Sequence, residues 1–185
     1  MRTEGQPKVN LMLRVVGILV YAALKSVNSR FFLPSSVSTW VESMRTRALI
    51  WQGACIGEGS RIRSNVFIAY PNNLKLGARV RIGDYSRIYN FSEFIVGNDT
   101  EIGPGLHVQT NEHEWFTIEK PIAKQGSRTK EIKVGANSYI GANVTLLSDI
   151  SVGPSSVVAA GAVVTKSFGG RALYGGVPAK KIRDL

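Results

Sequence analysis

The sequence has 185 residues, 44% of them hydrophobic, and a formal net charge of +10. This composition is that of a globular chain with a core and excludes a disordered protein, while the single cysteine excludes a disulfide framework and a cysteine-rich metal site. The basic residues are spread thinly and form no stripe with interleaved aromatics, so the charge favours a phosphate-bearing ligand or an anionic lipid over nucleic acid.

The first predicted element is a helix over residues 11–24, which are apolar apart from Arg14 and lie between Lys8 and Lys25. The segment is shorter than the about 20 residues that a membrane-spanning helix needs. Two interpretations remain open. The helix packs against the base of the following domain or on a second subunit, or it lies in a membrane interface with the flanking cations on anionic headgroups.

A second helix is predicted over residues 37–52, after a break at 34–36. Helical spacing divides its side chains into an apolar face of Val37, Trp40, Val41, Met44 and Ala48, and other positions that include Glu42, Arg45 and Arg47. We expect this helix to cover the open end of the domain that follows, since an uncovered end would expose strand edges.

From residue 56 onward an aliphatic residue returns at every sixth position, which is neither a helix period nor a strand period. The series begins with Ile56, Ile62 and Ile68 and continues through Leu76, Ile82, Ile88 and Phe94. After a two-residue slip it resumes at Val96, Ile102 and Val108, and it ends with Val134, Ile140, Leu146, Val152, Val158 and Val164. The fifth position of each repeat is small or β-branched in most cases. Short parallel strands coiled around a narrow core explain both features.

The pattern [LIV]-G-x-x-[STAV]-x resembles the hexapeptide repeat of the left-handed parallel β-helix acyltransferases. The resemblance implies an all-β repeat fold in which three hexapeptides make one triangular coil, and the left hand is carried over from the family. We expect an N-terminal helical extension over residues 1–55, the β-helix over 56–170 with a loop at about 109–133, and a C-terminal tail over 171–185.

The loop interrupts the repeat and contains His113. The segment 110–114, TNEHE, resembles the family's T-x-x-H-[DE], in which the histidine is the catalytic base. Imidazole titrates near neutral pH and suits removal of a hydroxyl proton; the alternative is a surface histidine without a task. The family often has an asparagine near the acceptor where Asn90 stands, although an asparagine there also serves to turn a corner. The acidic residues that could orient His113 are Glu93, Glu112 and Glu114.

Two further features of the loop region stay open. His107 precedes a frame position and is expected to point outward in a structural or interface role. Trp115 and Phe116 either line a pocket for the acceptor or pantetheine or anchor the loop.

Three later segments resemble the cofactor-binding segments of the family: NSYIGAN at 137–143, VAAGAVVTK at 158–166 and YGGVPAKKIR at 174–183. The resemblance implies that the pantetheine arm of acetyl-CoA lies along a groove between two subunits. The residues implied in cofactor binding are Tyr139, Gly141, Ala142, Ala160, Thr165, Lys166 and Arg183. The chain departs from the family at 167–170, where SFGG replaces an acidic residue and a proline pair, which affects the expected path of the tail.

The resemblance therefore implies a cytoplasmic, homotrimeric, acetyl-CoA-dependent O-acetyltransferase that requires no metal. Its expected acceptor is a sugar hydroxyl of a surface polysaccharide or of a lipid-linked precursor, with His113 as the base in a direct transfer. A small xenobiotic or an amino sugar is an alternative acceptor. The zinc carbonic anhydrases of the same fold need three histidines, and this chain has two. A non-catalytic scaffold is the remaining alternative, because fold alone does not decide function.

Overall fold

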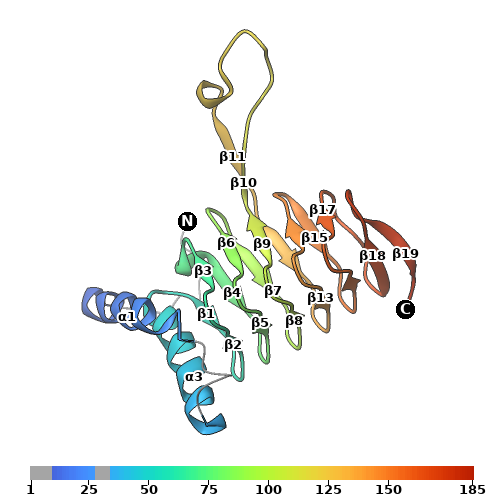
Figure 1. The fold of residues 1–185 in the computed structure, drawn as a ribbon. Coiled ribbons are helices and arrows are strands. Elements are labelled where there is room, and N and C mark those ends of the chain that lie inside the picture. Colours follow the sequence, from blue (N-terminus) through green and yellow to red (C-terminus); the bar gives the residue numbers. More distant parts are fainter. Residues whose placement is uncertain (1–9, 28–33) are drawn as a thin grey trace.

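The computed structural model describes residues 10–27 and 34–185. Two helices lie at one end of a parallel β-solenoid, and a long hairpin rises from one edge of its middle coils (Figure 1). The helices are α1 (Leu11–Leu24) and α3 (Ser35–Trp51), and two short 3-10 helices are η1 (Pro71–Asn73) and η2 (Ile122–Lys124). Neither α1 nor α3 is long and apolar enough to cross a membrane.

Three sheets, here called A, B and C, form the sides of the solenoid. Sheet A contains β1 (Cys55–Ile56), β4 (Leu74–Leu76), β7 (Phe94–Val96), β12 (Ile132–Val134) and β15 (Ile150–Val152). Sheet B contains β2 (Arg61–Ile62), β5 (Arg81–Ile82), β8 (Glu101–Ile102), β13 (Tyr139–Ile140), β16 (Val157–Val158), β18 (Ala172–Gly175) and β19 (Lys180–Asp184). Sheet C contains β3 (Phe67–Ile68), β6 (Arg87–Tyr89), β9 (His107–Gln109), β14 (Thr145–Leu146) and β17 (Val163–Val164). The hairpin consists of β10 (Asn111–His113) and β11 (Ser127–Thr129).

The repeat predicted from the sequence is confirmed by the core. The aliphatic frame residues point inward, and those from Ile62 onward are all buried, as are the compact fifth residues such as Val144, Ser156 and Ala162. The placement of Phe94 is a correction. It aligns with Leu74 and Ile132 at the fifth position, and Val96 takes the frame position on the same strand. Both side chains face the core because they are two residues apart on one strand.

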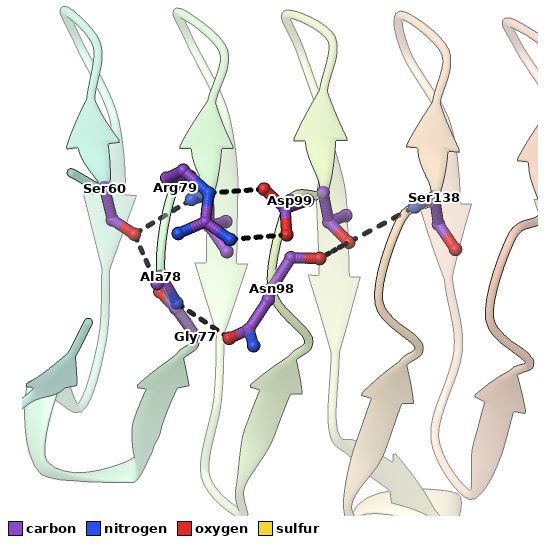
Figure 2. A network of polar contacts seen from close by, with 9 residues as sticks. Ser60, Gly77, Ala78, Arg79, Asn98, Asp99 and Ser138 are labelled. Carbon is purple, nitrogen blue, oxygen red and sulfur yellow. Dashed lines mark hydrogen bonds and ion pairs between the residues drawn. The ribbon is translucent and has the colours of Figure 1, made fainter. Parts of the chain in front are cut away.

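Polar side chains at the corners join successive coils (Figure 2). The Ser60 hydroxyl donates to the carbonyl of Gly77 at 2.7 Å, and the side-chain oxygen Oδ1 of Asn98 accepts from the N–H of Ala78 at 2.9 Å. Arg79 and Asp99 form a two-point ion pair at 2.5 and 2.7 Å on the outer surface. The corners therefore satisfy backbone groups that the short strands leave unpaired.

Helix α3 covers the N-terminal end of the solenoid, as predicted, with Leu49 in the main core cluster and Ala48 fully buried. Helix α1 crosses α3 at Gly17, where an added Cβ would lie 2.7 Å from the carbonyl oxygen of Ala48. The Tyr21 hydroxyl donates to the carbonyl of Val66 at 2.8 Å, and burial raises the pKa of this phenol. The side of α1 that carries Gly17 and Tyr21 thus packs at the base of the solenoid, as one of the two interpretations expects, and the opposite side of the helix is exposed.

The expected division of α3 into faces is wrong at four positions. Val37 and Trp40 are exposed, whereas Glu42 and Arg45 are buried. Arg45 donates through Nε to the carbonyl of Leu24 at 2.9 Å and through Nη2 to that of Val27, so it closes the C-terminal end of α1. Burial lowers the pKa of Arg45, and nearby Glu42 opposes this shift. Arg45 has carbonyl partners and Glu42 has arginine partners, so both side chains can be buried beside Val41 and Ala48.

The C-terminal tail continues the solenoid. Phe168 forms a one-residue parallel bridge with Val152 in line with sheet A, and its ring stacks on Tyr174 of β18 at 4.2 Å. The segment that departs from the family pattern therefore still completes a coil. Strand β19 then turns back antiparallel to β18, which places Arg183 opposite Leu173.

Candidate active site

His113 lies on the hairpin that leaves the solenoid after β9. It is the last residue of β10, pairs with Ser127 of β11, and its side chain is exposed. A pocket of about 450 Å³ opens beside it. The lining residues are Glu112, His113, Glu114, Trp115, Phe116 and Arg128. The fold thus presents the imidazole in a concave surface that an acceptor can enter, as general-base chemistry requires.

The three acidic candidates for orienting His113 have different partners. Glu93 pairs with Lys75 at 2.5 Å and Glu112 pairs with Arg128 at 3.1 Å. The carboxylate of Glu114 has no ion pair or hydrogen bond within residues 10–27 and 34–185. Of the three, Glu114 is the carboxylate that is left free beside the imidazole.

Trp115 and Phe116 do not anchor the loop within this chain, because they are 76% and 80% exposed. They line the His113 pocket, which agrees with the first of their two expected roles. Arg128 lines the same pocket, and the sequence analysis did not predict it. The antiparallel pairing of β10 with β11 brings it opposite Glu112, and the period of six carries no signal for that pairing.

Asn90 lies in a corner and is fully buried. Its side-chain oxygen accepts from the N–H of Tyr70 at 3.0 Å, and its amide donates to the carbonyl of Tyr70 at 2.7 Å. Both ends of the side chain are therefore engaged with backbone. This geometry favours the corner-turning interpretation of Asn90 over a catalytic one.

The structure brings three of the cofactor candidates together at the corner between sheets B and C. Gly141 of one coil lies directly against Ala160 of the next, so a Cβ on Gly141 would come within 2.5 Å of the Ala160 nitrogen. The N–H groups of Ala142 and Ala160 have no acceptor in the described part of the chain. A row of small residues with free N–H donors suits an extended ligand that carries amide carbonyls.

The other cofactor candidates lie elsewhere in this chain. Thr165 and Lys166 are exposed at the corner between sheets C and A, which is also the edge from which the hairpin leaves. Tyr139 faces outward on sheet B, in a surface pocket that includes Arg171. Arg183 is exposed on β19. Sheet C is consequently flanked by the His113 hairpin at one edge and by the small-residue corner at the other.

His107 points outward on sheet C and is half-buried, with its ring 5.5 Å from that of Tyr89. Within the described residues, no three His, Cys, Asp or Glu side chains gather as a metal site would require.

Comparison with known proteins adds sequence evidence to this geometry. The family model for bacterial transferase hexapeptide (six repeats) matches residues 131–166. A galactoside O-acetyltransferase of Escherichia coli is 25% identical over 71% of this chain and 64% of its own length, which is just under two thirds. A putative colanic acid biosynthesis acetyltransferase, WcaF, of the same organism is 29% identical over 71% of this chain and 70% of its own.

The residues that match the repeat model hold strands β12 to β17 of the solenoid. Residues 131–166 of this chain are thus similar to the hexapeptide-repeat transferases. A solved hexapeptide-repeat acetyltransferase of Vibrio cholerae, in complex with acetyl coenzyme A, shares the fold of this chain. The TM-score is 0.76 at 21% identity, over 94% of this chain and 87% of that one.

Proposed function

We propose that this protein is an acetyl-CoA-dependent O-acetyltransferase that acts on a sugar hydroxyl. The observation that carries the proposal is the exposed imidazole of His113 in its pocket on the hairpin, together with the free N–H donors of Ala142 and Ala160 at the opposite edge of sheet C, in the two coils that follow the hairpin. The named relatives act on galactosides or belong to polysaccharide biosynthesis, which supports a saccharide acceptor. A surface polysaccharide or its lipid-linked precursor is the acceptor that we favour.

The chemistry assigns one task to each feature. His113 takes the proton from the acceptor hydroxyl as the oxygen attacks the thioester carbonyl carbon. A backbone N–H near Ala142 stabilises the oxyanion, the C–O bond forms, the C–S bond breaks, and the imidazolium returns its proton to the thiolate. Lys166 supplies positive charge for the phosphates of the nucleotide. The hairpin and the small-residue corner lie on opposite edges of sheet C, which fits a homotrimer in which neighbouring subunits bring them together.

The first test replaces the base. We expect His113→Ala to fold and to bind acetyl-CoA as the parent does, and to lose about 10²-fold or more in kcat, the usual contribution of a general base. Lys124→Ala, on an exposed part of the same loop, is the matched control and keeps its kcat. Equal kcat in the His113→Ala variant and the parent would remove His113 from the mechanism.

The second test concerns acetyl-CoA binding. Acetyl-CoA should raise the melting temperature by mass action. Lys166→Glu should reduce that shift, whereas Lys25→Glu, at the C-terminal end of α1, should not. The absence of any shift at millimolar acetyl-CoA would favour a scaffold over an enzyme.

We also propose that the enzyme works in the cytoplasm at the inner face of the membrane, with α1 in the interface. The side of α1 that faces away from α3 exposes Leu11, Met12, Val15, Ile18 and Leu19, with exposed fractions from 47% to 78%. Among the described residues of the helical extension, the exposed charges are all basic, and the one acid, Glu42, is buried beside Arg61 and Arg63. An apolar face with basic flanks suits an anionic bilayer.

Flotation of the full-length protein with anionic liposomes tests this placement. Leu19→Glu should abolish flotation without changing the fold, because the side chain is already exposed, and Thr39→Glu on an exposed position of α3 should not. The competing model is a packing contact with a second subunit. It is supported if the parent stays in the soluble fraction at low salt and Leu19→Glu instead changes the mass of the oligomer.

A further inference from the structure

The outer face of sheet C carries a row of aromatic rings. The rings of Phe67 on β3 and Tyr89 on β6 are 5.3 Å apart, and those of Tyr89 and His107 on β9 are 5.5 Å apart. Phe67 is 42% exposed, and the other two are half-buried. Neither the Tyr89 hydroxyl nor the His107 ring has a hydrogen bond within the described residues. The row thus combines apolar ring surface with free polar atoms.

Arg87 lies in the same row, in register between Phe67 and His107. Its guanidinium is exposed and has no ion pair or hydrogen bond in the part of the chain that the structure describes. The corresponding arginines on sheet B are paired: Arg61 contacts Glu42, and Arg81 contacts Glu101 at 2.6 Å. Arg87 therefore stands out as a free cation among the aromatic rings.

The row leads toward His113. Tyr89 pairs in register with Gln109, whose amide donates to the side-chain oxygen of Asn111 at 2.5 Å on the way to the hairpin. The four residue-to-residue steps from Gln109 to His113 span at most about 13 Å of extended chain. An oligosaccharide whose terminal sugar sits at His113 can therefore reach the row with its neighbouring sugars, whereas a monosaccharide cannot reach both.

Resting on the proposed acetyl transfer, we propose that Phe67, Arg87, Tyr89 and His107 form a platform that binds an acidic oligosaccharide acceptor. Phe67 and Tyr89 stack against the apolar faces of sugar rings next to the one that is acetylated. Arg87 pairs with a carboxylate of such a neighbouring sugar, for which a planar guanidinium is well suited. The platform thus selects chain length and charge, and His113 performs the chemistry.

The experiment measures binding of galacturonic acid, trigalacturonic acid and neutral galactotriose by calorimetry, together with the mass of the oligomer. The parent should bind trigalacturonic acid most tightly. Phe67→Ala should weaken both trisaccharides by roughly three- to tenfold and leave the monosaccharide unchanged. Arg87→Gln should weaken trigalacturonic acid about tenfold and galactotriose less than twofold. The matched controls are Tyr85→Ala, an exposed corner tyrosine, and Arg47→Gln, and both should bind as the parent does.

Other outcomes overturn the platform. Unchanged affinities in Phe67→Ala and Arg87→Gln, or a parent that binds none of the three saccharides, would show that the row does not hold an acidic oligosaccharide. A loss of oligomer mass in Phe67→Ala would identify the row as a contact between copies of the chain. None of these outcomes touches the proposed reaction, which fails separately if His113→Ala keeps its kcat.

Discussion

Replacing Gly141 with alanine tests how closely the coils stack at the candidate cofactor corner. An alanine Cβ at this position would lie 2.5 Å from the nitrogen of Ala160, and 2.9 Å from both the Cα of Ala160 and the carbonyl oxygen of Val158. All three atoms belong to the backbone of the neighbouring coil. That backbone is held by the hydrogen bond from the Gly141 N–H to the Val158 carbonyl at 2.8 Å, so it cannot move away without loss.

The magnitude follows from the cost of forcing an extra carbon into a packed site, which is about 1–3 kcal/mol. We expect a value in the upper part of that range, because the clash is with backbone and not with a flexible side chain. For a chain of this size each kcal/mol lowers the melting temperature by about 2–4 °C. The expected decrease is therefore roughly 4–12 °C.

Gly169→Ala is the matched control. A Cβ at Gly169 would have no atom within 4 Å, and its backbone lies outside the left-handed region. This substitution should change stability by no more than about 1 kcal/mol, and in the stabilising direction. Thermal unfolding of both variants at one protein concentration, with and without acetyl-CoA, makes the comparison. Equal melting temperatures for the two variants would refute the claim that close stacking explains the glycine at position 141.

Three further predictions concern single side chains. Asn90→Ala should lower the free energy of unfolding by about 1–3 kcal/mol, because the backbone of Tyr70 loses its partners, while the folded enzyme keeps its kcat; a selective loss of kcat would restore Asn90 as a catalytic residue. Burial raises the pKa of Tyr21, so the stability it contributes is complete below about pH 10 and is lost as the pH rises further. Urea unfolding between pH 9 and 11 should therefore show a smaller decline for Tyr21→Phe than for the parent. Arg79→Ala should leave the midpoint of urea unfolding close to that of the parent despite its two-point ion pair, because the pair is exposed.

The sequence predicts the solenoid well because each inward side chain recurs at a fixed spacing. A residue such as Ile140 has to fill the same narrow space as its counterpart in the next coil, so the fold leaves a regular trace in the sequence. The sequence assigns the wrong repeat position to Phe94. Phe94 and Val96 both point inward from one strand, and their apolar character alone does not show which of them holds the frame position.

The helical extension and the site were less predictable. Helical spacing assigns Arg45 to an outer position, but the carbonyl groups of Leu24 and Val27 make its burial possible, and these partners come from another helix. Arg128 likewise enters the pocket of His113 only through the hairpin pairing. Such contacts depend on three-dimensional neighbours, which a single sequence does not reveal.

The position of the hairpin has a physical cause in the corners. The connections from sheet A to sheet B, such as 57–60 and 77–80, and those from B to C, such as 83–86 and 141–144, all have four residues. Glycines at these two corners press against the backbone of the next coil, which leaves no room for an inserted residue. The corner from C to A has no such glycine contacts, and its connections vary from 147–149 to 110–131. The solenoid can lengthen its chain only along this one edge without unstacking its coils. The candidate base, Asn90 and Lys166 all lie along it, so close packing at two corners determines where a site could be added at the third.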